Sequence, residues 1–299
     1  MKIAITGGSG FVGQEITKQL TDKGHEVFIL TRSDKQSDGS VHMVKWLTDG
    51  AKPEEHVEGM DAWINLAGAS INEGRWTSEQ KQKIYESRMN ATNEVLRIFK
   101  EVTKKPSVLI NASAIGIYPP SEHATYTEHS SYRGSDFLAK TVEDWESKAT
   151  EAEQFGTRVA CGRFGIILGK DQGALPLMAL PYKMGVGGKV GTGHQWVSWV
   201  HVADVAKAIL YAIENKDFSG PFNVTAPDPK QMNDFGGILG KVLQRPHWMP
   251  VPSLALKLVL GDKSQLVLEG QRVIPDKLLT HGFKFTYPDL QQALKNIYA

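Results

Sequence analysis

Three glycines near the start of the chain have the spacing of a site that binds the phosphates of a dinucleotide. Gly7, Gly10 and Gly13 follow the short apolar run at residues 3–5, and apolar residues at helical spacing come after them. In such a turn the first glycine lets the chain leave a strand sharply, the second lets backbone approach a pyrophosphate, and the third lets the helix pack closely. The helix N-terminus then offers free N–H groups to the phosphates. A glycine-rich turn without a ligand would have the same spacing, but the strand–turn–helix context favours a dinucleotide site. The rest of the same turn is included in the predicted site: Ser9, Phe11 and Val12.

The second predicted strand, residues 27–30, ends in a residue that indicates which dinucleotide is bound. Thr31 and Arg32 follow it, where an enzyme that uses NAD usually has Asp or Glu for the ribose 2′-hydroxyl. A guanidinium pairs with a 2′-phosphate through two hydrogen bonds, so Arg32 favours NADP over NAD. In the alternative, Arg32 is a solvated loop residue and Asp34 is the ribose ligand.

Three further strand ends supply candidate residues. The strand predicted at residues 61–68 ends in small side chains that let the chain pass close to a cofactor: Leu66, Ala67 and Gly68. Ser113 lies at the exit of the strand predicted within residues 108–118, where its hydroxyl can bind a reacting oxygen or simply bond to backbone. Arg163 ends the strand predicted at residues 158–163 and is included with the cofactor-binding residues.

A tryptophan-rich stretch, residues 195–201, could form the wall of a small-molecule pocket. Trp196 and Trp199 alternate there with Gln195 and Ser198, so that stacking surfaces lie beside hydrogen-bonding groups. A strand with core tryptophans would have the same composition, and both interpretations stay open. The hypothesis is that a small-molecule substrate binds near Trp196 and Trp199.

The composition excludes several other classes of function. A net charge of +1 over 299 residues gives no basis for binding nucleic acid or an anionic membrane. Cys161 is the one cysteine, so no internal disulfide can form, and His201 has no second His or Cys at ligand spacing, so no metal site is predicted. No signal peptide and no membrane-spanning segment is visible, and a cytoplasmic protein is expected.

Alternating apolar strands and amphipathic helices predict an α/β fold, a doubly wound parallel sheet with helices on both faces. Residues 1–165 are expected to form the NADP-binding Rossmann domain, with residues 195–225 returning to it. Residues 226–299, cut by prolines, are expected to form a smaller substrate or lid domain together with residues 166–194. Ser135 is predicted to cap a helix that runs to about Phe155.

Several segments together carry a resemblance to a known family: residues 6–13, 65–68, 113–118, 191–199 and 269–275. The chain resembles the extended short-chain dehydrogenase/reductase superfamily. Within it the chain looks like the YfcH-like epimerase family, which are atypical extended reductases with their own C-terminal domain. The resemblance covers essentially the whole chain.

The resemblance implies an NADP-dependent oxidoreductase, or an enzyme similar to nucleotide-sugar epimerases that works through transient oxidation of a small polar substrate. It is compatible with a homodimer. In the superfamily a Tyr-x-x-x-Lys pair supplies the proton and holds the nicotinamide ribose. Here Lys140 stands at the Lys position, but Asp136 stands where the Tyr would be, and none of the tyrosines has Lys four residues later. Ser113 would bind the reacting oxygen and Lys140 the nicotinamide ribose. The proton donor is unassigned: Tyr118 and Asp136 are the candidates, and Asp136, beside Lys140 on one helix face, is expected not to be the acid. The missing Tyr keeps an alternative open, an NADP-binding sensor or interaction protein without catalytic activity.

Overall fold

A seven-stranded parallel sheet forms the centre of the computed structural model, which describes residues 1–33 and 36–299 apart from the side chains of Ala255, Val259 and Leu260. Asp34, the alternative ribose ligand, lies outside the described residues. The strands of this sheet are β1 (Lys2–Thr6), β2 (Glu26–Thr31), β3 (Val41–Lys45), β4 (Ala62–Asn65), β5 (Val108–Ala114), β7 (Arg158–Phe164) and β11 (Gly220–Val224). Their order is β11-β7-β5-β4-β1-β2-β3, and every neighbouring pair is parallel. The predicted fold class is confirmed.

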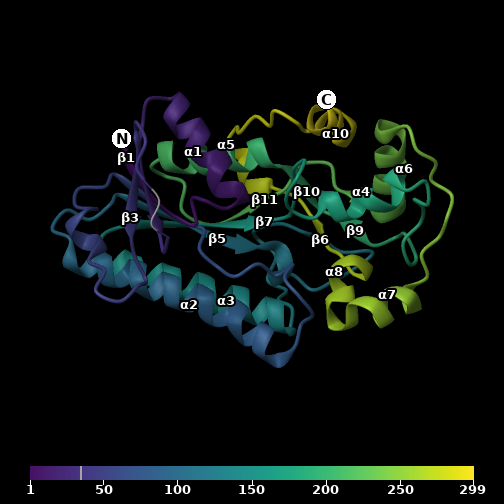
Figure 1. The fold of residues 1–299 in the computed structure, drawn as a ribbon, viewed down its shortest axis with the longest axis horizontal. Helices are drawn as coiled ribbons and strands as arrows, with labels where there is room; N and C mark the ends of the chain where they lie inside the picture. The colour runs from purple at the N-terminus through teal and green to yellow at the C-terminus, as the bar shows by residue number, and fades with distance from the viewer. Residues whose placement is uncertain (34–35) are drawn as a thin grey trace.

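Helices cover both faces of the sheet (Figure 1). The helices α2 (Ser78–Glu101) and α3 (Phe137–Thr150) pack together on one face, and α1 (Phe11–Asp22) and α5 (Val202–Glu214) pack together on the other. Each helix pair buries an apolar stripe against the strands, as the helical spacing of the sequence predicts.

The strand order reverses direction at β1, because β2 lies on one side of it and β4 on the other. Connections that leave in opposite directions open a crevice beyond the carboxyl ends of these strands, and ligands of doubly wound sheets bind there. Gly7 follows β1 directly, so the glycine turn lies at this crevice.

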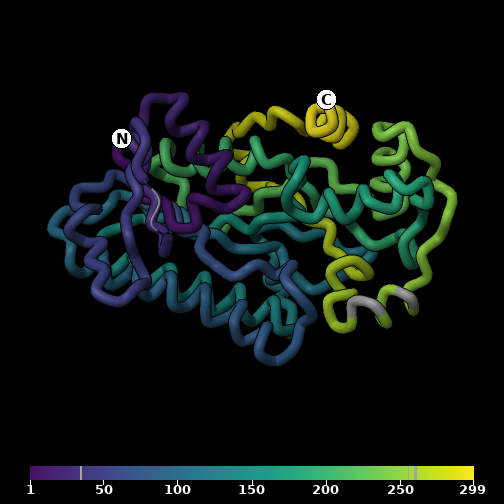
Figure 2. The backbone as a smooth tube through the Cα atoms, in the orientation of Figure 1, coloured from purple at the N-terminus to yellow at the C-terminus, as the bar shows by residue number. Residues whose placement is uncertain are grey.

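The remaining elements gather largely at one end of the sheet, on the right in Figure 2. Three two-stranded ladders tie them together: β8 (Ile166–Leu168) with β10 (Trp199–His201), β9 (Trp196–Val197) with β12 (Lys230–Gln231), and β6 (Thr125–Tyr126) with β13 (Arg272–Val273). Because β13 pairs with β6, the last third of the chain also packs on the first half. The pairing does not divide the chain at the predicted domain boundaries, which remain a prediction. These elements are β6 (Thr125–Tyr126), β8 (Ile166–Leu168), α4 (Leu175–Lys183), β9 (Trp196–Val197), β10 (Trp199–His201), β12 (Lys230–Gln231), α6 (Met232–Leu243), α7 (Ser253–Leu260), α8 (Gln265–Leu268), β13 (Arg272–Val273), α9 (Asp276–Thr280) and α10 (Leu290–Tyr298).

The start of α3 differs from the prediction. Asp136, and not Ser135, is the N-cap residue, and its carboxylate accepts a hydrogen bond from the Ala139 backbone N at 2.8 Å. The helix ends at Thr150 and continues as a 3₁₀ turn, Glu151–Phe155. Among the described residues, no helix combines the length and apolar character that crossing a membrane requires.

Candidate functional site

The glycine turn has the geometry of a phosphate cradle. Gly7 has φ of +71°, a left-handed conformation that favours glycine, and its carbonyl accepts a hydrogen bond from Gly10 N at 3.0 Å. A Cβ on Gly13 would lie 2.4 Å from the Gly7 carbonyl oxygen, so the close approach of α1 to the turn requires glycine there. A Cβ on Gly10 would meet only that oxygen, at 3.3 Å, because this position faces open space. The first N–H groups of α1 have no partner within the helix, and the residues present therefore fit a pyrophosphate.

Two adjoining cavities lie beside this turn, and their walls share six residues: Gly7, Gly10, Leu66, Gly68, Ala69 and Ser70. One, of about 960 Å³, lies at the end of β2 and is called the β2-side cavity. The other, of about 510 Å³, lies at the end of β5 and is called the β5-side cavity. Together they could hold the two halves of a dinucleotide. They bring together most of the predicted cofactor-binding residues: Gly7, Ser9, Gly10, Phe11, Val12, Gly13, Thr31, Arg32, Leu66, Ala67, Gly68 and Ser113.

Arg32 lies on the wall of the β2-side cavity with its side chain exposed. Next to it, the Thr31 and Ser33 hydroxyls are 2.9 Å apart, and the Thr31 hydroxyl also accepts a hydrogen bond from Ser33 N at 3.2 Å. This arrangement holds the end of β2 in place and leaves the guanidinium available for a 2′-phosphate, as the sequence predicts.

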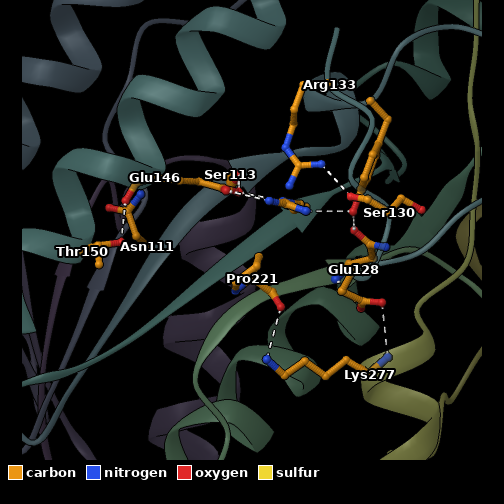
Figure 3. Close-up of polar contacts among 12 residues, drawn as sticks. Asn111, Ser113, Glu128, Ser130, Arg133, Glu146, Thr150, Pro221 and Lys277 are labelled. Atoms are coloured by element: carbon orange, nitrogen blue, oxygen red, sulfur yellow. Dashed lines mark hydrogen bonds and ion pairs between the residues drawn. The ribbon is translucent and has the colours of Figure 1, made fainter.

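Ser113 lies on the wall of the β5-side cavity and is 3% exposed. Its Oγ donates a hydrogen bond to Glu146 Oε1 at 2.5 Å, and the two labelled side chains meet in Figure 3. Glu146 also accepts two hydrogen bonds from Arg163, Nε at 2.8 Å and Nη2 at 2.7 Å. An ionised carboxylate can only accept, so the Ser113 hydroxyl proton is committed to Glu146. What Ser113 offers a ligand is therefore its lone pairs.

Arg163 and Tyr118 lie in a buried hydrogen-bond network, and the geometry gives no support to the site roles predicted for them. Arg163 is 2% exposed and donates through Nη1 to the Tyr118 hydroxyl at 2.8 Å, and that hydroxyl lies 2.9 Å from Asn223 Oδ1. Neither residue is part of the wall of the two cavities in the described part of the chain. Burial raises the pKa of Tyr118, which keeps the phenol protonated inside this network. The signal that could have shown this is an arginine on a central strand, which needs a buried counter-ion.

The geometry gives no support to the predicted role of Lys140 either. Leu138, Val142 and Trp145 are on the face of α3 that borders the β5-side cavity, whereas Lys140 is exposed and borders neither cavity. Residues four apart share a helix face and residues two apart do not, so Leu138 and Val142 form the pair that faces the cavity. Asp136 borders the cavity, but its carboxylate caps the helix.

The two tryptophans have different roles. Trp196 borders the β5-side cavity and donates through Nε1 to the Glu122 carbonyl at 2.8 Å. The Arg272 guanidinium carbon lies 4.9 Å from the centre of the Trp196 ring. Trp199 is fully buried and donates to the Asp228 carbonyl at 3.0 Å, so it belongs to the core and not to a substrate pocket. Only the part of the prediction that concerns Trp196 fits the geometry.

Two residues of the site were not predicted, Glu146 and Arg88. Arg88 projects from α2 into the β5-side cavity. It follows the buried Ile84 by four residues, which places a charge on the apolar stripe of the helix and could have marked it. Cys161 is buried, and burial raises the pKa of its thiol, which makes it unreactive. No group of three potential metal ligands occurs among the described residues.

The chain is similar to proteins of one family along its length. The model of the NAD dependent epimerase/dehydratase family matches residues 3–225, and that of a domain of unknown function, DUF1731, matches residues 251–297. Epimerase family protein YfhF of Bacillus subtilis is 49% identical over 300 residues, with 100% of this chain and 98% of that protein covered. The crystal structure of human epimerase family protein SDR39U1 (isoform 2) with NADPH has a TM-score of 0.90 at 31% identity and 99% coverage of both chains. The UDP-glucose 4-epimerase of Thermus thermophilus in complex with NAD has a TM-score of 0.77 at 19% identity, covers 99% of this chain and 97% of its own, and shows the fold alone.

Proposed function

The chain belongs to the NAD dependent epimerase/dehydratase family, and from this premise we propose that it is an NADP(H)-dependent oxidoreductase or epimerase that acts on a small polar substrate bearing a hydroxyl group. The observation that carries the proposal is the pair of cavities that meet at the glycine turn, with Arg32 in one wall and Ser113 in the other. The human relative, whose crystal structure is described as containing NADPH, supports NADP over NAD.

The residues of this chain divide the binding of the dinucleotide between them. The N-terminus of α1 and the turn around Gly10 hold the pyrophosphate, and Arg32 pairs with the 2′-phosphate. Leu66 and Gly68 border both cavities and would lie along the middle of the dinucleotide. When bound, NADP supplies the exchange of a hydride with a substrate carbon.

Ser113 positions the reacting group. Because its proton is donated to Glu146, its oxygen accepts a hydrogen bond from the substrate hydroxyl, and the rigid Glu146–Arg163 pair fixes the direction of that bond. Trp196, on the wall of the same cavity, offers an aromatic surface against which a ring can pack.

One observation favours a second function, an NADP-binding sensor without turnover. The α3 face bordering the β5-side cavity presents Leu138 and Val142, and neither side chain can move a proton. The described residues around this cavity include no Tyr, Lys or His. The two functions differ in whether a substrate changes the redox state of the bound dinucleotide.

The experiment combines binding with turnover. NADPH and NADP⁺ are titrated against the protein, and absorbance at the nicotinamide band is then followed with a panel of nucleotide-linked sugars and free polyols. The proposal predicts turnover that Ser113→Ala lowers at least tenfold, because the reacting hydroxyl loses its acceptor. Ser107→Ala, at the exposed opposite end of β5, is the matched control and should leave turnover unchanged. Tight NADPH binding without turnover on any panel member favours the sensor, and absence of NADPH binding rejects both.

A further inference from the structure

Arg88 borders the β5-side cavity, and no other cationic side chain occurs among the described residues of the cavity wall. It lies on α2, and its guanidinium lies 5.1 Å from the centre of the Trp145 ring. Within the described part of the chain both of its hydrogen bonds use Nη1, one to the Ala69 carbonyl at 3.2 Å and one to the Ile84 carbonyl at 2.8 Å. These contacts fix the guanidinium plane and leave Nε and Nη2 for a ligand.

The charge of Arg88 has no carboxylate to pair with among the described residues. Asp136 and Glu269, the two acids of the β5-side cavity wall, form no ion pair with it. Burial lowers the pKa of Arg88 to about 10, so the side chain stays charged near neutral pH. Arg88 borders the cavity, and neither its Nε nor its Nη2 is completely buried. A partly desolvated and unpaired cation at a ligand cavity is suited to an anion.

The position of Arg88 relates it to the glycine turn. Cβ at Gly68 would lie 3.1 Å from Cγ and from Cζ of Arg88, so the guanidinium packs directly on this residue. Gly68 borders both cavities. Leu66, two residues earlier, packs closely on the glycine turn, since a Cβ on Gly7 would lie 3.0 Å from the Leu66 backbone. The segment that ends β4 therefore contacts both the glycine turn and Arg88, and Gly10 and Arg88 border the same β5-side cavity.

We propose that Arg88 binds the pyrophosphate of NADP(H) and forms, with the N-terminus of α1, a clamp around it. This inference rests on the proposed binding of NADP(H). Arg88 comes from α2, outside the residues predicted to bind the cofactor, and the Trp145 ring supports its guanidinium from beneath. A planar guanidinium donates two parallel hydrogen bonds to phosphate oxygens, whereas backbone amides supply single ones.

Three ligands separate the pyrophosphate from the rest of the dinucleotide. NADPH contains every part, 2′-phospho-ADP-ribose retains the pyrophosphate but lacks nicotinamide, and 2′-AMP lacks the pyrophosphate. Their affinities are measured by calorimetric titration for the wild type, Arg88→Met and Arg88→Lys. The methionine keeps an apolar stem against Trp145, and Lys140→Met is the control that removes an exposed cation of α3.

Arg88→Met should weaken NADPH and 2′-phospho-ADP-ribose by the same factor, about tenfold to a hundredfold, and leave 2′-AMP unchanged. Arg88→Lys keeps the charge and loses the planar fork, so it should weaken the same two ligands by a smaller common factor, and it decides the matter if Arg88→Met does not fold. Unchanged NADPH affinity overturns the assignment. So does a loss confined to NADPH, which would place Arg88 at the nicotinamide half. If the wild type binds none of the three ligands, the proposed function itself fails.

Discussion

Removing the Glu146 carboxylate is predicted to destabilise the protein by about 3–5 kcal/mol, since it leaves a buried charge without its partner. Arg163 is 2% exposed, and two of its three side-chain hydrogen bonds go to Glu146. In Glu146→Ala the guanidinium keeps only Tyr118, and Ser113 loses its acceptor. An exposed ion pair would contribute at most about 1 kcal/mol, so the two cases differ clearly.

The assay is the free energy of unfolding from urea denaturation, and the control is a double variant. Glu146→Leu combined with Arg163→Met removes both charges and keeps similar volumes, so it should recover most of the lost stability. A destabilisation of Glu146→Ala below about 1 kcal/mol would refute the reasoning. A folded double variant with greatly weakened NADPH affinity would show instead that the network of Ser113, Glu146 and Arg163 supports cofactor binding as well as stability.

Three other predictions concern the cofactor and pH. Arg32→Ala should weaken NADPH about tenfold to a hundredfold and leave NADH nearly unchanged in a fluorescence titration, and equal losses for both would contradict the 2′-phosphate contact. Gly10→Ala should lower the melting temperature only slightly, since its methyl meets one backbone oxygen at 3.3 Å, yet weaken NADPH strongly by entering the cradle; unchanged affinity would argue against a pyrophosphate there. Burial lowers the pKa of His201 below the ordinary value of 6.5 for histidine. The unfolded state therefore takes up a proton first, and stability should fall as pH drops below about 6.5. The His201 ring caps α5 by accepting a hydrogen bond from Ala203 N, and an Asn in its place can accept the same bond. In urea denaturation between about pH 5 and 8, the unfolding free energy of His201→Asn should therefore depend less on pH than that of the wild type. An identical pH dependence would exclude His201 as the cause.

Local spacing made the cofactor half of the site predictable. Gly7 and Gly13 each satisfy a constraint set within a few residues, a left-handed turn and a close backbone approach. Gly10 leaves open space in the same turn, and Arg32 follows a strand that apolar residues alone identify. Such features depend on neighbouring residues, so the sequence contains them.

The half of the site at β5 depends on contacts between distant elements. Which face of α3 borders the cavity is set by packing on β5 and β7, and Leu138 rather than Lys140 lies on it. The partners Glu146 and Arg163 come from a helix and a strand, and Arg88 enters from a third element. No spacing rule links these residues, since the fold alone brings them together.

A crystal structure of the protein with NADPH tests the central claim most directly. The account predicts the pyrophosphate on the backbone amides that begin α1, the 2′-phosphate within hydrogen-bond distance of Arg32, and the nicotinamide half in the cavity that contains Ser113. A dinucleotide bound away from the glycine turn, or one in the reverse orientation with its adenosine in the β5-side cavity, would contradict it.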